Sequence, residues 1–128
     1  MSPETYQRLC NRTECDQGAA RLRYNTLRAV RLNHAVIGLA GEIGELASLV
    51  EKHLHYGQPL DEISLKDELG DCLWYISLAC NALGINLADV MTANIAKLTV
   101  RYPDKYSDDC AAHRDRQAEA QVMTGELV

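Results

Sequence analysis

Apolar residues recur at the spacing of a helix face over two long stretches of the chain. The first stretch runs from about Leu27 to Tyr56, and its stripe consists of Val36, Leu39, Ile43, Leu46, Leu49 and Val50. Gly57 and Pro59 predict its end, because glycine favours the left-handed C-cap and proline cannot continue a helix. In the second stretch, Ser64 and Asp67 resemble a capping box and predict a helix from Ser64 to Gly84. Its apolar positions include Leu65, Leu69, Leu73, Ile76 and Leu83.

Shorter helices are predicted on either side of this pair. Ser2-Pro3-Glu4 is typical of a helix start, which predicts a short helix through about Arg12 and a partly helical connection over residues 13–26. Asn86 predicts the cap of a further helix that ends near Arg101, before Pro103. Beyond Ser107 the sequence is polar, which predicts a tail or a frayed helix over residues 107–128.

The pattern as a whole predicts an all-α protein with a four-helix-bundle-like core. No stretch alternates as a strand does, and short connections favour antiparallel packing of neighbouring helices. We expect one helical domain over residues 1–106, followed by the segment 107–128. The apolar stripes are wide for so short a bundle, so we expect the chain to oligomerise, as a homodimer or homotetramer, to complete its core.

Composition narrows the possible partners. The net charge of −5 argues against a protein that binds nucleic acid by neutralising many phosphates, but it allows a polyphosphate to be held through metal ions. The five cysteines are odd in number and none are spaced as Cys-x-x-Cys, which favours reduced thiols in a cytoplasmic protein. No apolar run has the roughly 18 residues of a transmembrane helix, so no membrane partner is expected.

Two pairs of carboxylates are the strongest candidate chemistry. Glu42 and Glu45 lie three residues apart in the first long helix, and Glu68 and Asp71 have the same spacing in the second, so each pair shares one helix face. One such pair alone is typical of a solvated surface. If the helices are antiparallel the pairs converge, and two charges at about 4 Å repel by about 4 kcal/mol at an effective dielectric constant of about 20. Oxygen ligands without His or Cys favour Mg²⁺, for which Mn²⁺ can substitute.

Glycines surround the first pair. Gly38, Gly41 and Gly44 each cost about 1 kcal/mol in a helix relative to alanine, so we expect another helix or a ligand to approach closely there. Gly70 repeats the pattern between Glu68 and Asp71. Neither a phosphate-binding loop nor a dinucleotide fingerprint is present, because no Gly-Lys-Ser/Thr follows and no strand precedes.

Three segments together resemble a known family. They are Gly-Leu-Ala-Gly-Glu-Ile-Gly-Glu at 38–45, Asp-Glu-Leu-Gly-Asp-Cys-Leu-Trp-Tyr at 67–75, and Asn-Ile-Ala-Lys-Leu at 94–98 with Arg101-Tyr102-Pro103. The chain resembles the MazG-like all-α nucleoside triphosphate pyrophosphohydrolases, in their short, single-domain phage or bacterial form, over residues 33–106. The resemblance implies a MazG core, a dimer or a dimer of dimers, Mg²⁺, and hydrolysis of a nucleoside triphosphate to the monophosphate and pyrophosphate. It also implies metal binding by Glu42, Glu45, Glu68 and Asp71.

Catalytic and substrate-binding roles follow as hypotheses. Glu42 or Glu45 is expected to orient or deprotonate the attacking water. Asn94, Lys97 and Arg101 form a stripe at i, i+3 and i+7 that is expected to reach phosphates, and the family motif favours Asn94 and Lys97 in particular. Further substrate-binding candidates are Lys52, for a phosphate, and Trp74, Asn33 and His34, for the base.

Two other functions remain open from the sequence. One is another nucleotide pyrophosphohydrolase on the same scaffold, acting for example on phosphoribosyl-ATP or a dinucleotide. The other is a non-catalytic helical dimerisation or regulatory module, which the complete set of four carboxylates disfavours. The base and the sugar of the substrate are also open.

Overall fold

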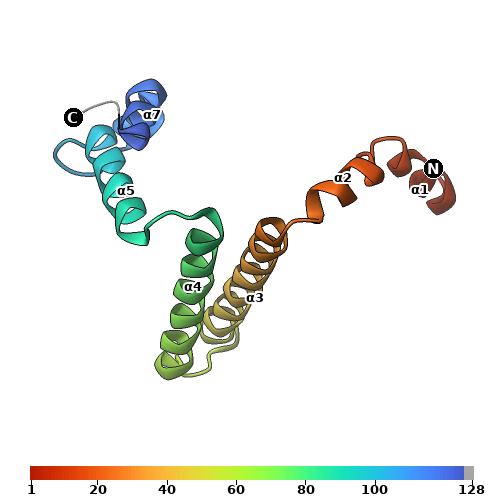
Figure 1. The fold of residues 1–128 in the computed structure, drawn as a ribbon. Helices are drawn as coiled ribbons and strands as arrows, with labels where there is room; N and C mark the ends of the chain where they lie inside the picture. The colour runs from red at the N-terminus through yellow and green to blue at the C-terminus, as the bar shows by residue number, and fades with distance from the viewer. Residues whose placement is uncertain (126–128) are drawn as a thin grey trace. The chain divides into compact units, whose positions relative to one another are not determined.

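The computed structural model describes residues 1–125, and helices are the only regular secondary structure in that range (Figure 1). This confirms the predicted all-α fold class. The helices are α1 (Pro3–Asn11), α2 (Gln17–Tyr24), α3 (Leu27–Tyr56), α4 (Glu62–Leu83), α5 (Leu87–Arg101), α6 (Asp108–Ala112) and α7 (Arg116–Thr124).

Local capping chemistry sets most of the helix ends where the sequence predicts them. The Ser2 hydroxyl accepts the Thr5 N–H at 3.2 Å at the start of α1, and Asn86 Oδ1 accepts the Ala88 N–H at 2.9 Å at the start of α5. Helix α3 ends at Gly57, whose φ of 66° is the left-handed conformation expected of a C-cap glycine.

The start of α4 differs from the prediction. Helix α4 begins at Glu62, because Asp61 rather than Ser64 caps it. The Asp61 carboxylate accepts the Ser64 N–H at 3.0 Å and the Ser64 hydroxyl at 2.8 Å. A carboxylate is the stronger acceptor, so Ser64 donates to the cap instead of forming it.

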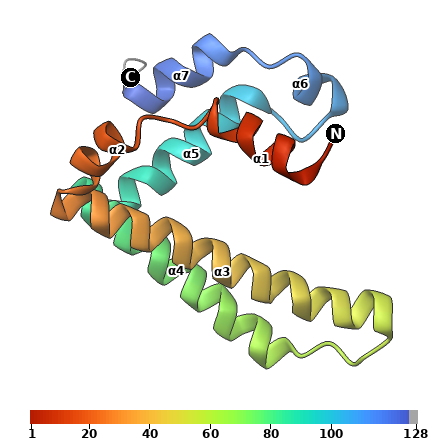
Figure 2. The same ribbon diagram turned by 90° about the vertical axis from the view of Figure 1, so that its right-hand side faces the viewer.

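The chain divides into two compact units, the first of which is Met1–Leu83. Within it, α3 and α4 lie side by side and run in opposite directions, joined by the short connection 57–61 (Figure 2). The fully buried apolar residues of this hairpin are Ala35, Cys72 and Cys80. An antiparallel pair has only one internal interface, which explains why its buried core is small.

One glycine of α3 receives the close approach that the sequence predicts. Gly38 lies against the ring of Tyr75 from α4, and a Cβ atom at Gly38 would overlap that ring. Gly41, Gly44 and Gly70 differ, since a Cβ atom there would meet nothing within 4 Å among the described residues. Close packing at these three positions is therefore not supplied by the protomer itself.

Much of the predicted apolar surface stays exposed on the hairpin. In the α3 stripe, Leu39, Leu46 and Leu49 are half-buried, whereas Val36 and Ile43 remain 61% and 54% exposed. On α4, Leu73 is 60% exposed. Exposed apolar side chains therefore occur along both long helices.

The second unit begins at Gly84 and contains α5, α6 and α7. Helix α7 packs against α5 and is capped by Asp115 at its start and by Gly125, with φ of 76°, at its end. The segment predicted as a tail or frayed helix over 107–128 thus forms two capped helices as far as Gly125, and its last three residues lie outside the described residues. The contacts divide the chain after Leu83, whereas the sequence places its boundary after residue 106.

No single helix within residues 1–125 is long and apolar enough to cross a membrane. In that range, only α4 and α5 taken together, as a bent pair, have the length and composition of a membrane span. All five cysteines are free thiols.

Candidate metal centre and surrounding site

Three of the four predicted metal ligands come together between α3 and α4. Glu42 of α3 and Glu68 and Asp71 of α4 each offer a carboxylate oxygen, and these oxygens lie within 4.8 Å of one another. The i, i+3 spacing of Glu68 and Asp71 puts both on the side of α4 that meets α3. The antiparallel hairpin then brings Glu42 opposite them, as the sequence analysis requires for a shared site.

The geometry of this cluster suits a small divalent cation. Mg²⁺ binds oxygens at about 2.1 Å in octahedral geometry, so ligands on opposite sides of the ion are about 4.2 Å apart. The 4.8 Å spread of the three oxygens is therefore close to the span of a single ion. The donor set contains only carboxylates, which are ligands for a hard cation.

Electrostatics also favours a cation at this position. Burial raises the pKa of the Glu68 carboxyl, and hydrogen bonding with Glu42 and the charges of Glu45, Glu42 and Asp71 raise this pKa further. None of these neighbours is positive. The cluster therefore holds more negative charge than the chain compensates, and either a proton or a metal ion relieves the repulsion.

Glu45 lies outside the group of three. Its side chain is exposed, and its charge still acts on Glu68. Its role as a ligand remains a prediction.

A neighbouring hollow is lined by a cation, Lys66, that is not among the residues predicted from the sequence. The hollow has a volume of about 420 Å³ and lies along the first turns of α4, lined by Ile63, Ser64, Lys66, Asp67, Gly70 and Asp71. Lys66 thus shares a cavity with the metal-ligand candidate Asp71. The signal in the sequence was the position of Lys66, one turn before Gly70, which lacks a side chain to fill the space.

An aromatic cluster forms on the same hairpin. The ring of Trp74 meets the ring of Tyr75 edge to face at 4.9 Å, and His34 of α3 lies 5.7 Å from Tyr75 and 6.3 Å from Trp74, between ring centroids. His34 and Trp74 are predicted substrate-binding residues, whereas Tyr75 was not predicted. Gly38 was the signal for it, because the missing side chain is what lets the Tyr75 ring approach α3.

The remaining predicted substrate-binding residues lie in different surroundings. The Asn33 side-chain carbonyl accepts a hydrogen bond from the Tyr24 hydroxyl at 3.0 Å, which ties α3 to α2. Lys52 is exposed near the end of α3. In the second unit, Asn94 is exposed and Lys97 is half-buried on α5.

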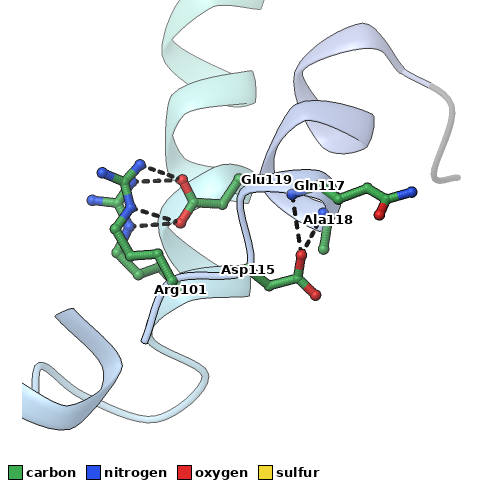
Figure 3. Close-up of polar contacts among 6 residues, drawn as sticks. Arg101, Asp115, Gln117, Ala118 and Glu119 are labelled. Carbon is green, nitrogen blue, oxygen red and sulfur yellow. Dashed lines mark hydrogen bonds and ion pairs between the residues drawn. The ribbon is translucent and has the colours of Figure 1, made fainter. Parts of the chain in front are cut away.

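Arg101 is already paired within the second unit. Its Nε and Nη2 atoms donate to the Glu119 carboxylate at 2.8 and 2.7 Å, and Figure 3 shows this bidentate contact between the end of α5 and α7. Arg114 donates to the same carboxylate at 3.2 and 2.6 Å. Glu119 is only 4% exposed, and the hydrogen bonds from Arg101 and then Arg114 hold its pKa far below the ordinary value. Sequence analysis did not single out Glu119, because nothing in the polar segment marked one acid as buried.

The fold and the acidic cluster define an all-α protein with a carboxylate site suited to a divalent cation. Residues 32–106 match the family described as the MazG nucleotide pyrophosphohydrolase domain. This is more than half of the chain, and the chain belongs to the MazG family. Membership supports nucleotide pyrophosphohydrolase activity in general terms and the divalent-metal dependence that is usual in the family.

A relative and the solved structures give a narrower comparison. The chain is 35% identical over 74 residues to the Gene 37 protein of Mycobacterium phage L5. The aligned region covers 55% of this chain and spans 65% of the length of that relative. No solved structure matches the chain.

Proposed function

We propose that the chain hydrolyses nucleoside or deoxynucleoside triphosphates between the α- and β-phosphates, releasing the monophosphate and pyrophosphate in a Mg²⁺-dependent reaction. The observation that carries this proposal is the convergence of Glu42, Glu68 and Asp71 within the MazG region of the chain. A cluster of acids that repel one another favours a substrate that arrives with metal, and triphosphates do so.

Glu42, Glu68 and Asp71 would hold the ion. When bound, Mg²⁺ neutralises phosphate oxygens and lowers the pKa of a coordinated water. Glu45 is the better candidate to orient or deprotonate the attacking water, because it is exposed and lies outside the group of three while its charge still acts on Glu68. Mn²⁺ is expected to substitute for Mg²⁺, since both accept carboxylate oxygens.

The aromatic cluster supports a role in holding the base. Trp74 is 54% exposed, so its ring has a face available for stacking, and His34 lies at its edge with hydrogen-bonding nitrogens. Asn33, close in sequence to His34, is proposed to help by hydrogen bonding. The phosphates are assigned to Asn94, Lys97 and Lys52 on the family motif and on charge. Arg101 can join them only through the N–H groups of Nη1 and Nη2 that are not used, because Nε and one Nη2 hydrogen already donate to Glu119.

We also propose that the active form is a homodimer or a homotetramer of this chain. The exposed apolar residues Val36, Ile43 and Leu73 and the unpartnered Gly41 and Gly44 support association through the α3–α4 hairpin. Small residues allow two helix backbones to approach closely, and apolar side chains supply the area that a stable interface needs.

The test is a panel of ribo- and deoxynucleoside triphosphates with Mg²⁺ or Mn²⁺, in which pyrophosphate and orthophosphate are measured separately. We expect pyrophosphate in a one-to-one ratio with the monophosphate. Release of orthophosphate alone would contradict the proposed reaction class.

Single substitutions locate the activity within the site. Glu42→Gln and Glu45→Gln should each reduce pyrophosphate release strongly, while the matched variant Glu51→Gln, at an exposed position of the same helix, should not. If both site variants keep wild-type turnover, the proposed site is wrong. Light scattering during chromatography measures the oligomeric state of the same samples.

A further inference from the structure

Beyond the carboxylate site, the second unit contains a cleft with an excess of positive charge. The cleft lies between α5 and α7, has a volume of about 360 Å³, and is lined by Lys97, Arg114, Arg116, Glu119, Ala120 and Met123. That volume corresponds to roughly a dozen water molecules at about 30 Å³ each, so a small hydrated anion fits. Concentrated positive charge is unusual in a chain whose net charge is −5.

The negative groups beside the cleft already have partners of their own. Glu119 accepts from both Arg101 and Arg114, so this carboxylate carries two positive partners (Figure 3). Asp115 Oδ1 accepts hydrogen bonds from the Gln117 and Ala118 N–H groups at 3.1 and 3.0 Å and so caps α7, as Figure 3 also shows.

The cations of the cleft keep donors for a ligand. Lys97 and Arg116 form no ion pair with any residue in the described part of the chain. Arg114 uses Nε and Nη2 on Glu119, which leaves its Nη1 donors, and its side chain is 38% exposed. The buried Glu119 holds the Arg114 fork in one orientation, so part of the cleft is ordered before a ligand arrives.

We propose that this cleft binds the phosphate groups of a pyrophosphate-class anion. Arg forks and a Lys point charge together match the several charged oxygens of linked phosphates better than those of a single small anion. Arg114 and Arg116 lie beyond residues 32–106, in the connection before α7 and at the first residue of α7, so they are supplied in addition to the family domain. The site shares Lys97 with the phosphate-binding residues of the proposed function, but it uses neither the carboxylates nor a metal, so metal-free anion binding is measured separately from hydrolysis.

Methionine methyl NMR on the whole, metal-free chain in EDTA tests the site. The chain has three methionines, of which Met123 lines the cleft and Met91 does not. Addition of sodium pyrophosphate at low salt should shift the Met123 methyl signal saturably and leave Met91 unchanged. Absence of a saturable Met123 shift, or an equal affinity for sulfate, would overturn the proposal.

Matched variants assign the binding to the cleft. Arg116→Gln and Lys97→Gln should each weaken pyrophosphate binding by roughly twofold to fivefold, the range for removing one exposed charge partner. Arg8→Gln and Lys105→Gln, at exposed positions outside the cleft, should bind as the wild type does. Arg116 forms no ion pair that holds α7 in place, so its replacement tests binding without removing a described structural contact. Wild-type affinity in both cleft variants would contradict the assignment.

Comparison of ligands identifies the source of the anion. If the cleft accepts the triphosphate chain of a nucleotide, ATP should shift Met123 as inorganic triphosphate does, and AMP should not. If it accepts the released product, pyrophosphate should bind and ATP should not. Either result supports an anion site in the cleft. Binding that appears only with Mg²⁺ and disappears in Glu42→Gln would place the anion at the carboxylates and would contradict the proposed cleft site. If the wild-type chain binds pyrophosphate without metal but hydrolyses no nucleoside triphosphate, only the proposed function is contradicted.

Discussion

The two units of this chain handle a half-buried or buried glutamate in opposite ways. In the α3–α4 hairpin, Glu68 lies among Glu42, Glu45 and Asp71, and its pKa is raised. Between α5 and α7, Glu119 lies between two guanidinium groups, and its pKa is lowered. A carboxylate compensated by the chain itself holds two helices together, whereas carboxylates left uncompensated are ready to accept an external cation. The same residue type is therefore charge-compensated in one unit and uncompensated in the other.

The largest expected effect is on activity at the uncompensated site. Glu68→Gln removes a metal-ligand candidate, and we expect pyrophosphate release to fall by at least about 100-fold, the upper range for residues that merely support metal ligands. The melting temperature of the metal-free variant should equal or exceed that of the wild type, because repulsion is relieved. Mg²⁺ should raise the melting temperature of the wild type and have little effect on the variant. A variant that retains full Mg²⁺-dependent stabilisation would contradict the metal role of Glu68.

The same substitution at the compensated site should act on stability. Glu119→Gln leaves Arg101 and Arg114 without their charged acceptor, so the melting temperature should drop by several degrees. Calorimetry against Glu51→Gln, an exposed glutamate of α3, provides the control. Equal melting temperatures in the two variants would show that the Glu119 contacts do not stabilise the second unit.

The contributions of Glu119 and Glu68 to the stability of the fold should depend on pH with opposite signs. A lowered pKa means that Glu119 stabilises the fold above the ordinary value of 4.5, and this contribution disappears as the pH falls below it. A raised pKa means that Glu68 destabilises the metal-free fold at neutral pH, and this cost disappears as the pH falls through the raised pKa towards 4.5.

Thermal melts in EDTA from neutral to acidic pH measure both trends. Glu119→Gln should lower the melting temperature relative to the wild type, whereas Glu68→Gln should raise it or leave it equal. Both differences in melting temperature should shrink as the solution becomes acidic. A difference that stays constant over this range would contradict the assigned cause of the corresponding pKa shift.

The smallest expected effect is the change in stability when either of two glycines of α3 is replaced by alanine. Gly38→Ala should destabilise the hairpin, because the added Cβ overlaps the Tyr75 ring. Gly41→Ala meets nothing within 4 Å and should raise the free energy of unfolding of an isolated protomer by up to about 1 kcal/mol, the difference in helix propensity. Denaturant unfolding at several protein concentrations measures both. If Gly41→Ala is destabilising and lowers the oligomer fraction, a second chain approaches this face of α3.

Helix positions and much of the candidate site were predictable because they depend on short-range patterns. The apolar stripe and Gly57 place α3 at Leu27–Tyr56, as the structure has it, and the i, i+3 spacing pairs the carboxylates within each helix. The start of α4 was predicted late, because Asp61 and Ser64 both have capping side chains and only the folded chain decides which one accepts. Tyr75 is marked only indirectly, by Gly38 on the other helix, and Glu119 carries no local signal because its partners are distant in the sequence.

The all-α class, the ends of most helices, the carboxylate pairs and the resemblance to the MazG family follow from the chain alone, because periodicity, capping and spacing are properties of neighbouring residues. Which acids share one cluster depends on how α3 and α4 pack, so it could be seen only in the folded chain. Tertiary packing brought together Glu42, Glu68 and Asp71, left Glu45 outside the group, and paired Arg101 with Glu119. Charge compensation is set by the groups that surround a side chain in space. The polar C-terminal segment packs on α5, where its buried Glu119 meets Arg101 and Arg114.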